Sequence, residues 1–277
     1  MSGPAAMAAD QPLIELVNLG KRFGEGANRV VAVKGVNMAL HKGEFVTLIG
    51  PSGSGKSTLF NMIAGLLEPD ADGSIVVGGR RQKDGELLGK VSFMPQRDLL
   101  LPWRTVLDNA IVALEVEGVR KKEAREKARA LFGEFGLAGF EDKYPHELSG
   151  GMRQRVALMR TFLFERDLIL LDEPFGALDA LTRSLMQRWL LDIWAHHKRT
   201  VLFITHDIDE AIYLGDKVAV MSTRPGTIKY SETIALPRPR APEITTTAEF
   251  AGIKKRLLAV VEEESLKSFE PTKKATC

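Results

Sequence analysis

Short apolar runs alternate along this chain with segments whose apolar residues recur at helical spacing. The runs 45–49, 168–171 and 201–204 are apolar at nearly every position, which is typical of parallel strands buried on both faces. Between 103 and 140 the pattern changes, and Ala124, Ala128 and Leu131 share one helical face. Strands that alternate with helices in this way predict an α/β core with a mainly parallel sheet.

The pattern also predicts where the individual elements lie. Strands are expected at 13–19, 30–40, 45–49, 74–77, 91–94, 168–172, 201–204, 217–221 and 228–235. Lys21–Asn28 is interpreted as a turn, and helices are expected from Lys56 onward and at 151–164, about 181–196, 208–214 and about 250–266. We therefore predict a flexible N-terminus (1–12), a main domain (13–222) with a helical part at about 98–165, and a C-terminal strand, Pro-rich spacer and helix (223–277).

Composition excludes some classes of protein. The 277 residues include 38 Lys and Arg against 36 Asp and Glu, and this net charge of +2 disfavours a nucleic-acid binder with a broad basic face. The only cysteine is Cys277, so no internal disulfide can form. Because the longest apolar runs fall far short of the roughly 20 residues that span a bilayer, we expect a cytoplasmic protein that meets a membrane only through a partner.

The segment after the strand at 45–49 matches the pattern G-x-x-x-x-G-K-[ST] and opens a helix. In such a loop the glycines let backbone N–H groups wrap phosphates, the lysine reaches the outer phosphates, and the serine hydroxyl binds Mg²⁺. A chance Gly-rich turn is the alternative, which the strand-to-helix context disfavours. We therefore predict a nucleoside triphosphate site formed by Gly50, Pro51, Ser52, Gly53, Ser54, Gly55, Lys56, Ser57 and Thr58.

Three polar residues follow apolar strands at the edge where ligands bind in α/β sheets. Asp172 ends the run Leu168–Leu171 and is placed to hold Mg²⁺, and Glu173 follows it, where a carboxylate can orient or deprotonate water. His206 follows the strand at 201–204 and precedes a helix that Asp207 would cap. Alone, each is more often an ordinary strand end or turn residue. Together with the phosphate loop they favour phosphate chemistry.

Taken together, these motifs resemble the ATP-binding subunit of an ABC transporter. The segment Leu148–Arg155 (LSGGMRQR) matches that family's signature, and the resemblance covers roughly 13–222, with every motif in the family's order. It implies a P-loop NTPase core with an antiparallel β edge subdomain and a helical subdomain that bears the signature. Phe23 would stack on adenine, although the family more often has Tyr; Gln96 would link Mg²⁺ and water to the membrane partner. His206 would be the switch histidine and Asp179 the D-loop acid.

Helix length bears on how the signature is used. A helix over 151–164 is about 21 Å long at 1.5 Å per residue, so its Ser149-Gly150 end should lie far from Asp172. Two phosphate-binding ends that cannot reach one nucleotide suggest that Ser149, Gly150 and Gly151 serve the ATP of a second chain. We therefore expect two such subunits, identical or related, to pair head-to-tail.

Several stretches resemble the nitrate/sulfonate/taurine group of bacterial importers: the Leu-Leu-Pro-Trp cluster ending at Trp103, 173–179 (EPFGALD), 222–226 (STRPG) and 236–240 (LPRPR). This implies a peripheral subunit at the cytoplasmic membrane face. Its permease partner would dock on the Gln96–Trp103 region, and a solute-binding protein would act indirectly. The alternatives are that Trp103 is core and the Pro-Arg run a solvated linker.

Other functional classes fit less well. A DNA-acting ABC ATPase would carry a long coiled coil, a translation-associated one would have two such cores, and a GTPase would need a guanine-reading motif that the sequence lacks. A lipid-handling or exporting ABC subunit remains an alternative, because this subunit never contacts the solute.

Overall fold

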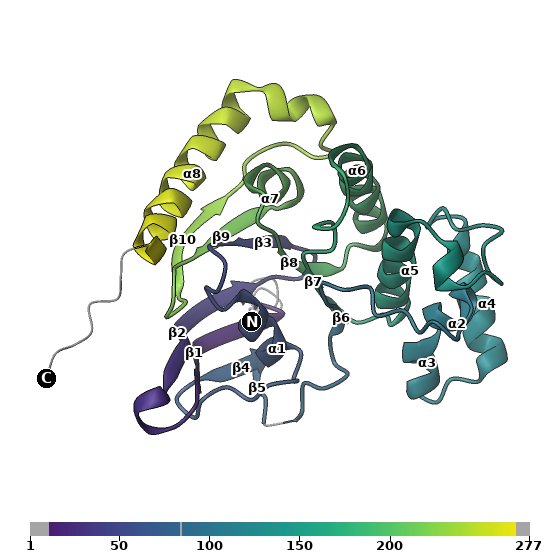
Figure 1. The fold of residues 1–277 in the computed structure, drawn as a ribbon, viewed down its shortest axis with the longest axis horizontal. Helices are drawn as coiled ribbons and strands as arrows, with labels where there is room; N and C mark the ends of the chain where they lie inside the picture. Colours follow the sequence, from purple (N-terminus) through teal and green to yellow (C-terminus); the bar gives the residue numbers. More distant parts are fainter. Residues whose placement is uncertain (1–10, 84, 270–277) are drawn as a thin grey trace, which may run out of the picture. The chain divides into compact units, whose positions relative to one another are not determined.

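The computed structural model describes residues 11–83 and 85–269, and most of the predicted flexible N-terminus (1–12) lies outside them. The chain forms two compact units (Figure 1). The first is drawn from Met1–Leu88 and Leu202–Cys277, and the second is Gly89–Val201. In the described part of the chain, no helix is both long and apolar enough to cross a membrane.

An antiparallel sheet forms one part of the first unit. Its strand order is β2-β1-β4-β5, and its strands are β1 (Ile14–Phe23), β2 (Val30–Leu40), β4 (Ser74–Val77) and β5 (Arg80–Arg81). The predicted end of the first strand at Leu19 is wrong, because β1 continues to Phe23, which pairs with Val30. Register shifts between Leu16 and Arg22, with Asn18 at φ 49°, interrupt the alternation of polar and apolar residues that the prediction relied on.

The second sheet of this unit supplies the strand that leads to the phosphate loop. Here the order is β10-β9-β3-β8, with β3 (Phe45–Ile49), β8 (Thr200–Ile204), β9 (Lys217–Met221) and β10 (Ile228–Thr233). β3 and β9 are parallel, and every residue of β3 is buried, as its apolar run predicts. Helices α1 (Lys56–Ile63) and α7 (Ile208–Leu214) begin directly after the loops that follow β3 and β8.

The C-terminal segment packs on this first unit through buried polar contacts. It contains a 3-10 turn (Pro242–Thr246) and α8 (Ala248–Phe269). Arg240 is only 5% exposed and donates hydrogen bonds to the carbonyls of Ile212, Tyr213 and Gly215, at the end of α7. Burial lowers the pKa of Arg240 to about 10. The interpretation of 236–240 as a solvated linker is therefore wrong, because this arginine satisfies helix-end carbonyls.

Helices dominate the second unit. It contains β6 (Ser92–Met94), which is parallel to β7 (Leu168–Asp172), and the first residues of β8. Its helices are α2 (Val106–Ala110), α3 (Val112–Val116), α4 (Lys121–Phe132), α5 (Gly150–Leu163) and α6 (Ala180–His197), with a 3-10 turn at Pro145–Glu147. Phe135 contacts both Phe162 of α5 and Trp189 of α6, with ring centroids 6.0 and 5.3 Å away. These edge-to-face contacts join α5 and α6 into one core.

Candidate functional site

Glycine geometry shapes the loop between β3 and α1. Gly50 and Gly55 have φ values of 155° and 97°, which side-chain-bearing residues rarely adopt. A Cβ atom on Gly50 would lie 2.6 Å from the carbonyl oxygen of Met221, and one on Gly55 would lie 2.9 Å from that of Ala32. The loop can therefore follow this path only with glycine at both positions.

Lys56 is the first residue of α1 and lies inside the loop that precedes it. The residue is 6% exposed, and its Nζ donates to the carbonyl oxygens of Gly50 at 2.8 Å and Pro51 at 3.0 Å. A buried ammonium that lies among backbone carbonyls is a cation held ready for an anion in the same loop. Ser57, the next residue, is exposed in the first turn of α1.

Two predicted site residues of the first unit, Phe23 and His206, lie outside the phosphate loop. Phe23 ends β1, its side chain is 42% exposed, and the Nζ of Lys21 lies 5.9 Å from the centroid of its ring. His206 is exposed in the turn between β8 and α7. Asp207 caps α7, as predicted, by accepting hydrogen bonds from the N–H groups of Asp209 and Glu210. An exposed aromatic ring and an exposed imidazole are both accessible to a ligand.

Gln96 and Glu173 meet in the second unit, although 77 residues separate them in sequence. The Nε2 of Gln96 donates to the Oε2 of Glu173 at 3.0 Å. Asp172, which ends the fully buried β7, is 6% exposed. The structure thus joins the amide of Gln96, which follows β6, to the carboxylate of Glu173, which follows β7. The carboxylate of Asp172 is next to Glu173 in sequence.

Glu173 has a strained backbone. Its φ of 48° lies in the left-handed region, which costs an L-residue other than glycine roughly 1 kcal/mol or more. The turn is closed by a hydrogen bond from the N–H of Gly176 to the carbonyl of Glu173, at 3.1 Å. Backbone strain is often found at functional sites, which agrees with the role predicted for Glu173, although Asn18, Leu99, Glu165 and Lys198 have similar positive φ values.

The signature residues form the start of α5. Ser149 caps the helix by accepting a hydrogen bond from the N–H of Met152, and Gly150 is its first helical residue. A Cβ atom on Gly151 would lie 3.4 Å from the Cγ2 of Thr182, so this helix start adjoins the start of α6. Asp179 caps α6, and the hydrogen bond from Thr182 lowers the pKa of its carboxyl group. The first turn of α5 contains no acidic residue, so its N–H groups suit an external anion.

One set of contacts was not predicted from the sequence. Arg160, in the last turn of α5, donates to the carbonyl oxygens of Asp98 at 2.6 Å and Leu99 at 3.1 Å, and burial lowers its pKa. Arg153, seven residues earlier on α5, lies 3.5 Å from the carboxylate of Asp98. The sequence offered one indication of these contacts: Arg153 and Arg160 are seven residues apart, which places both on one face of a helix. These contacts tie the helix that bears the signature to the segment that follows Gln96.

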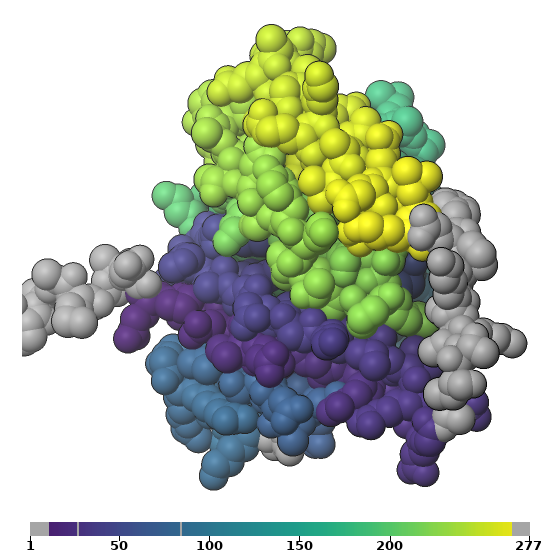
Figure 2. All heavy atoms as spheres, turned by 90° about the vertical axis from the view of Figure 1, so that its left-hand side faces the viewer, coloured from purple at the N-terminus to yellow at the C-terminus, as the bar shows by residue number. Residues whose placement is uncertain are grey.

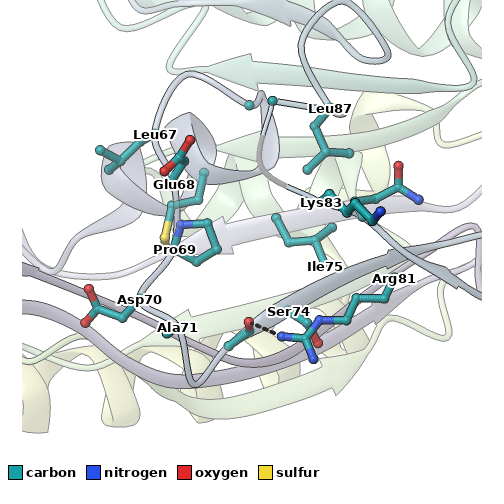
Figure 3. A pocket seen from close by; sticks show the side chains of 15 residues that line it. Leu67, Glu68, Pro69, Asp70, Ala71, Ser74, Ile75, Arg81, Lys83 and Leu87 are labelled. Carbon is teal, nitrogen blue, oxygen red and sulfur yellow. Dashed lines mark hydrogen bonds between the residues drawn. The ribbon is translucent and has the colours of Figure 1, made fainter.

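A cavity of about 290 Å³ in the first unit is separate from these residues. Its wall is formed by the end of α1, the segment that follows it, and strands β4 and β5 (Figure 3). Arg81 lines it and donates a hydrogen bond to the carbonyl oxygen of Gly73 at 3.3 Å (Figure 3). None of the predicted site residues lines this cavity, so it is not the predicted phosphate site.

The strain at Glu173 can be tested through stability. Because glycine adopts a positive φ without strain, we expect Glu173→Gly to be about 1 kcal/mol more stable than Glu173→Ala. At Glu126, an exposed position within α4, the order should be reversed, since glycine is destabilising within a helix. Chemical denaturation of the four variants measures both differences. An alanine variant at 173 as stable as the glycine variant would contradict the strain.

Comparison with known proteins identifies the family of this chain. Residues 33–176 match a family model described as ABC transporter. An uncharacterised ABC transporter ATP-binding protein of Methanocaldococcus jannaschii is 44% identical over 93% of this chain and 94% of its own. The aliphatic sulfonates import ATP-binding protein of Bacillus cereus is 42% identical over 91% of this chain and 97% of its own.

A solved structure extends the likeness to three dimensions. It is the dimeric structure of an ATP-binding cassette in a post-hydrolysis state with ADP and Pi, and it is 31% identical to this chain. The match has a TM-score of 0.70 and covers 81% of this chain and 100% of that one. The fold class predicted from the sequence is confirmed. This chain belongs to the ABC transporter family, as one of its ATP-binding cassettes.

Proposed function

We propose that this chain is the ATP-hydrolysing subunit of an importer for a small solute of the nitrate, sulfonate or taurine kind. The Gln96–Glu173 hydrogen bond carries the proposal, because it connects a residue suited to activating water with the segment that would sense a membrane partner. The 42% identity to a sulfonate-import protein over nearly the whole chain supports the choice of solute class.

For nucleotide binding, we assign Lys56 to the outer phosphates and Phe23 to the adenine ring. The lysine is already enclosed by its loop, and the phenylalanine has an exposed face that can stack. Mg²⁺ would be held by the hydroxyl of Ser57, the carboxylate of Asp172 and, as the family resemblance implies, Gln96. All three side chains offer the oxygen ligands that this ion prefers. When bound, Mg²⁺ would neutralise part of the phosphate charge.

For hydrolysis, we assign the water-orienting role to Glu173 and the γ-phosphate contact to His206. Glu173 is strained and accepts a hydrogen bond from Gln96, which orients a carboxylate that can in turn orient or deprotonate water. His206 can donate to the phosphate oxygens on which negative charge develops during the reaction. Closure and reopening around ATP would then move the partner through the segment after Gln96.

We further propose that each ATP is completed by a second cassette, which is either another copy of this chain or a related subunit. The start of α5, with Ser149, Gly150 and Gly151, is suited to bind phosphate, and Asp179 adjoins it. The related cassette bound to ADP and Pi is a dimer. The idea that Ser149 lies too far from Asp172 to share its nucleotide remains a prediction.

The permease would dock on the apolar residues that follow Gln96, at the cytoplasmic membrane face. Trp103 is 73% exposed and Leu99 is 58% exposed, so the alternative that Trp103 is core is wrong. Leu99 has a φ of 46°, and its carbonyl oxygen accepts a hydrogen bond from Arg160. This bond fixes the segment that bears Leu99 and Trp103 to α5. An exposed apolar cluster on a fixed segment suits a short amphipathic helix of a partner.

Glu173→Gln tests the enzymatic role. Glutamine keeps the size and an acceptor oxygen but cannot take a proton, so we expect ATP hydrolysis to fall about 100-fold or more while ATP binding persists. With ATP bound but not hydrolysed, the variant should also form dimers in gel filtration more readily than the parent chain. Hydrolysis at the parent rate, or a strictly monomeric species at high concentration, would contradict this assignment.

Trp103→Ala and Leu100→Asp test the docking surface in the complex purified with its membrane partner. We expect solute uptake to fall about tenfold, as for a central interface residue, and ATP affinity to stay within about twofold. Val116→Ala, at a position that is 84% exposed on α3, is the matched control and should leave uptake unchanged. Loss of ATP binding in the Trp103 variant would instead mean that this residue supports the fold.

A further inference from the structure

The turn between β9 and β10 packs against the phosphate loop. Gly226 is buried there, and a Cβ atom on it would lie 1.8 Å from the carbonyl oxygen of Ser54. The N–H of Gly226 donates to the carbonyl oxygen of Ala32, and the carbonyl of Gly226 accepts from the N–H of Lys34, both at 2.9 Å. The turn is therefore fixed both to the loop and to β2, at a separation that only glycine permits.

Arg224 projects from this turn at the loop. One of its guanidinium nitrogens, Nη2, is 3.7 Å from the position that a Cβ atom on Gly53 would occupy. Arg224 is exposed, and among residues 11–83 and 85–269 it has no hydrogen bond or ion pair. An unpaired guanidinium within contact distance of a phosphate loop is a cation without a counter-charge, and its planar fork of donors matches phosphate oxygens.

The C-terminal helix holds the turn in place through a buried carboxylate. Glu264 of α8 is 2% exposed and accepts a hydrogen bond from the N–H of Thr223 at 3.1 Å. Lys267 donates to the same carboxylate at 2.6 Å, and Lys229 of β10 lies 3.9 Å from it. Burying a carboxylate is costly unless it is paired, and these partners offset that cost. Figure 2 shows this end of α8 (yellow) beside the hairpin of β9 and β10 (light green).

The same helix also contacts the segment after His206. Lys254 of α8 lies 2.8 Å from the carboxylate of Asp209, in the first turn of α7. The C-terminal helix therefore binds both the 222–226 turn, which packs against the phosphate loop, and the start of α7. The helix also packs on the unit through the buried Phe250, Ile253 and Leu257, so these polar contacts add to an apolar interface.

We propose that Arg224 contacts the phosphates of the bound nucleotide and that Glu264 of the C-terminal helix is the residue that positions it. This rests on the proposed function, because it needs ATP at the phosphate loop. Arg224 and Lys56 would then both bring positive charge to the phosphates. Arg224 would do so beside Gly53, which has no side chain. Glu264 would act through Thr223, which is the residue before Arg224.

The test measures Mg²⁺·ATP affinity of the full chain by calorimetry, in a Glu173→Gln background that prevents turnover. Loss of a charged hydrogen bond predicts about tenfold weaker binding for Arg224→Ala, with Arg224→Lys intermediate. The deficit should shrink at high salt, because exposed charges are screened. Arg188→Ala removes an exposed arginine from α6 as the matched control and should bind as the parent does. Parent-like affinity in Arg224→Ala would overturn the proposal.

Glu264 is tested by a double-mutant cycle. Glu264→Ala should weaken ATP binding, whereas Glu264→Gln, which keeps an acceptor for the N–H of Thr223, should restore most of it. If Glu264 acts through Arg224, then Glu264→Ala adds nothing in the Arg224→Ala background. If Glu264→Ala instead damages the structure in general, it lowers ATP affinity whether or not Arg224 is present. A double variant that binds ATP more weakly than Arg224→Ala alone would therefore overturn the positioning role.

Lys56→Ala separates this inference from the proposed function. If that variant binds ATP as tightly as the parent, the site itself is wrong and the proposed function fails. If Lys56→Ala loses ATP binding while Arg224→Ala keeps it, only the role of Arg224 fails. The melting temperature of the nucleotide-free Arg224→Ala variant should equal that of the parent, because its side chain makes no contact that stabilises the fold.

Discussion

Under the proposed function, the negative charge of bound phosphates is the constraint on which this structure depends. Two helix starts meet it with backbone N–H groups and glycines: α1 after the phosphate loop, and α5 in the signature, and neither has an acid in its first turn. Two others, α6 and α7, are capped by their own Asp179 and Asp207. The start of α1 has no side-chain cap and that of α5 is capped only by the neutral hydroxyl of Ser149, so neither helix start carries a negative charge of its own.

In the second unit, the proposed chemistry depends on one strained residue and its partner. Glu173 keeps a left-handed backbone that glycine would adopt at lower cost, and Gln96 binds its carboxylate. From Gln96 the chain continues to Leu99, which Arg160 fastens to the helix that carries the signature. Under the proposed function, a change at the nucleotide would reach the exposed Trp103 through Gln96 and the segment that follows it.

The sequence was most informative where one residue type dictates local geometry. Buried apolar runs placed β3 and β9 with the bounds that the structure has, and glycines placed the loop that turns from β3 into α1. β1 was predicted too short because its register shifts depend on pairing with β2, which lies beyond a local pattern. The same reason hid the contacts of Arg160 with Asp98 and of Glu264 with Thr223, which join residues 62 and 41 positions apart.

Sequence patterns also could not reveal conformation at single residues. Nothing in the sequence around Glu173 predicts its positive φ, and only the structure shows that Trp103 is exposed and not part of the core. Arg240 shows the opposite case, because a Pro-Arg run that looks like a solvated linker has its last arginine buried at the end of α7. Burial is a property of the whole fold, so local composition predicts it poorly for long charged side chains.

The central claim is that two chains complete each ATP site, and mixing two inactive variants tests it most directly. Lys56→Ala disables the phosphate loop, and Gly150→Asp places a negative charge at the signature, where a side chain has room. Each variant alone should hydrolyse almost no ATP. An equal mixture should recover about a quarter of the parent activity, because half of the dimers then hold one intact site of two. A mixture no more active than its components would contradict the account.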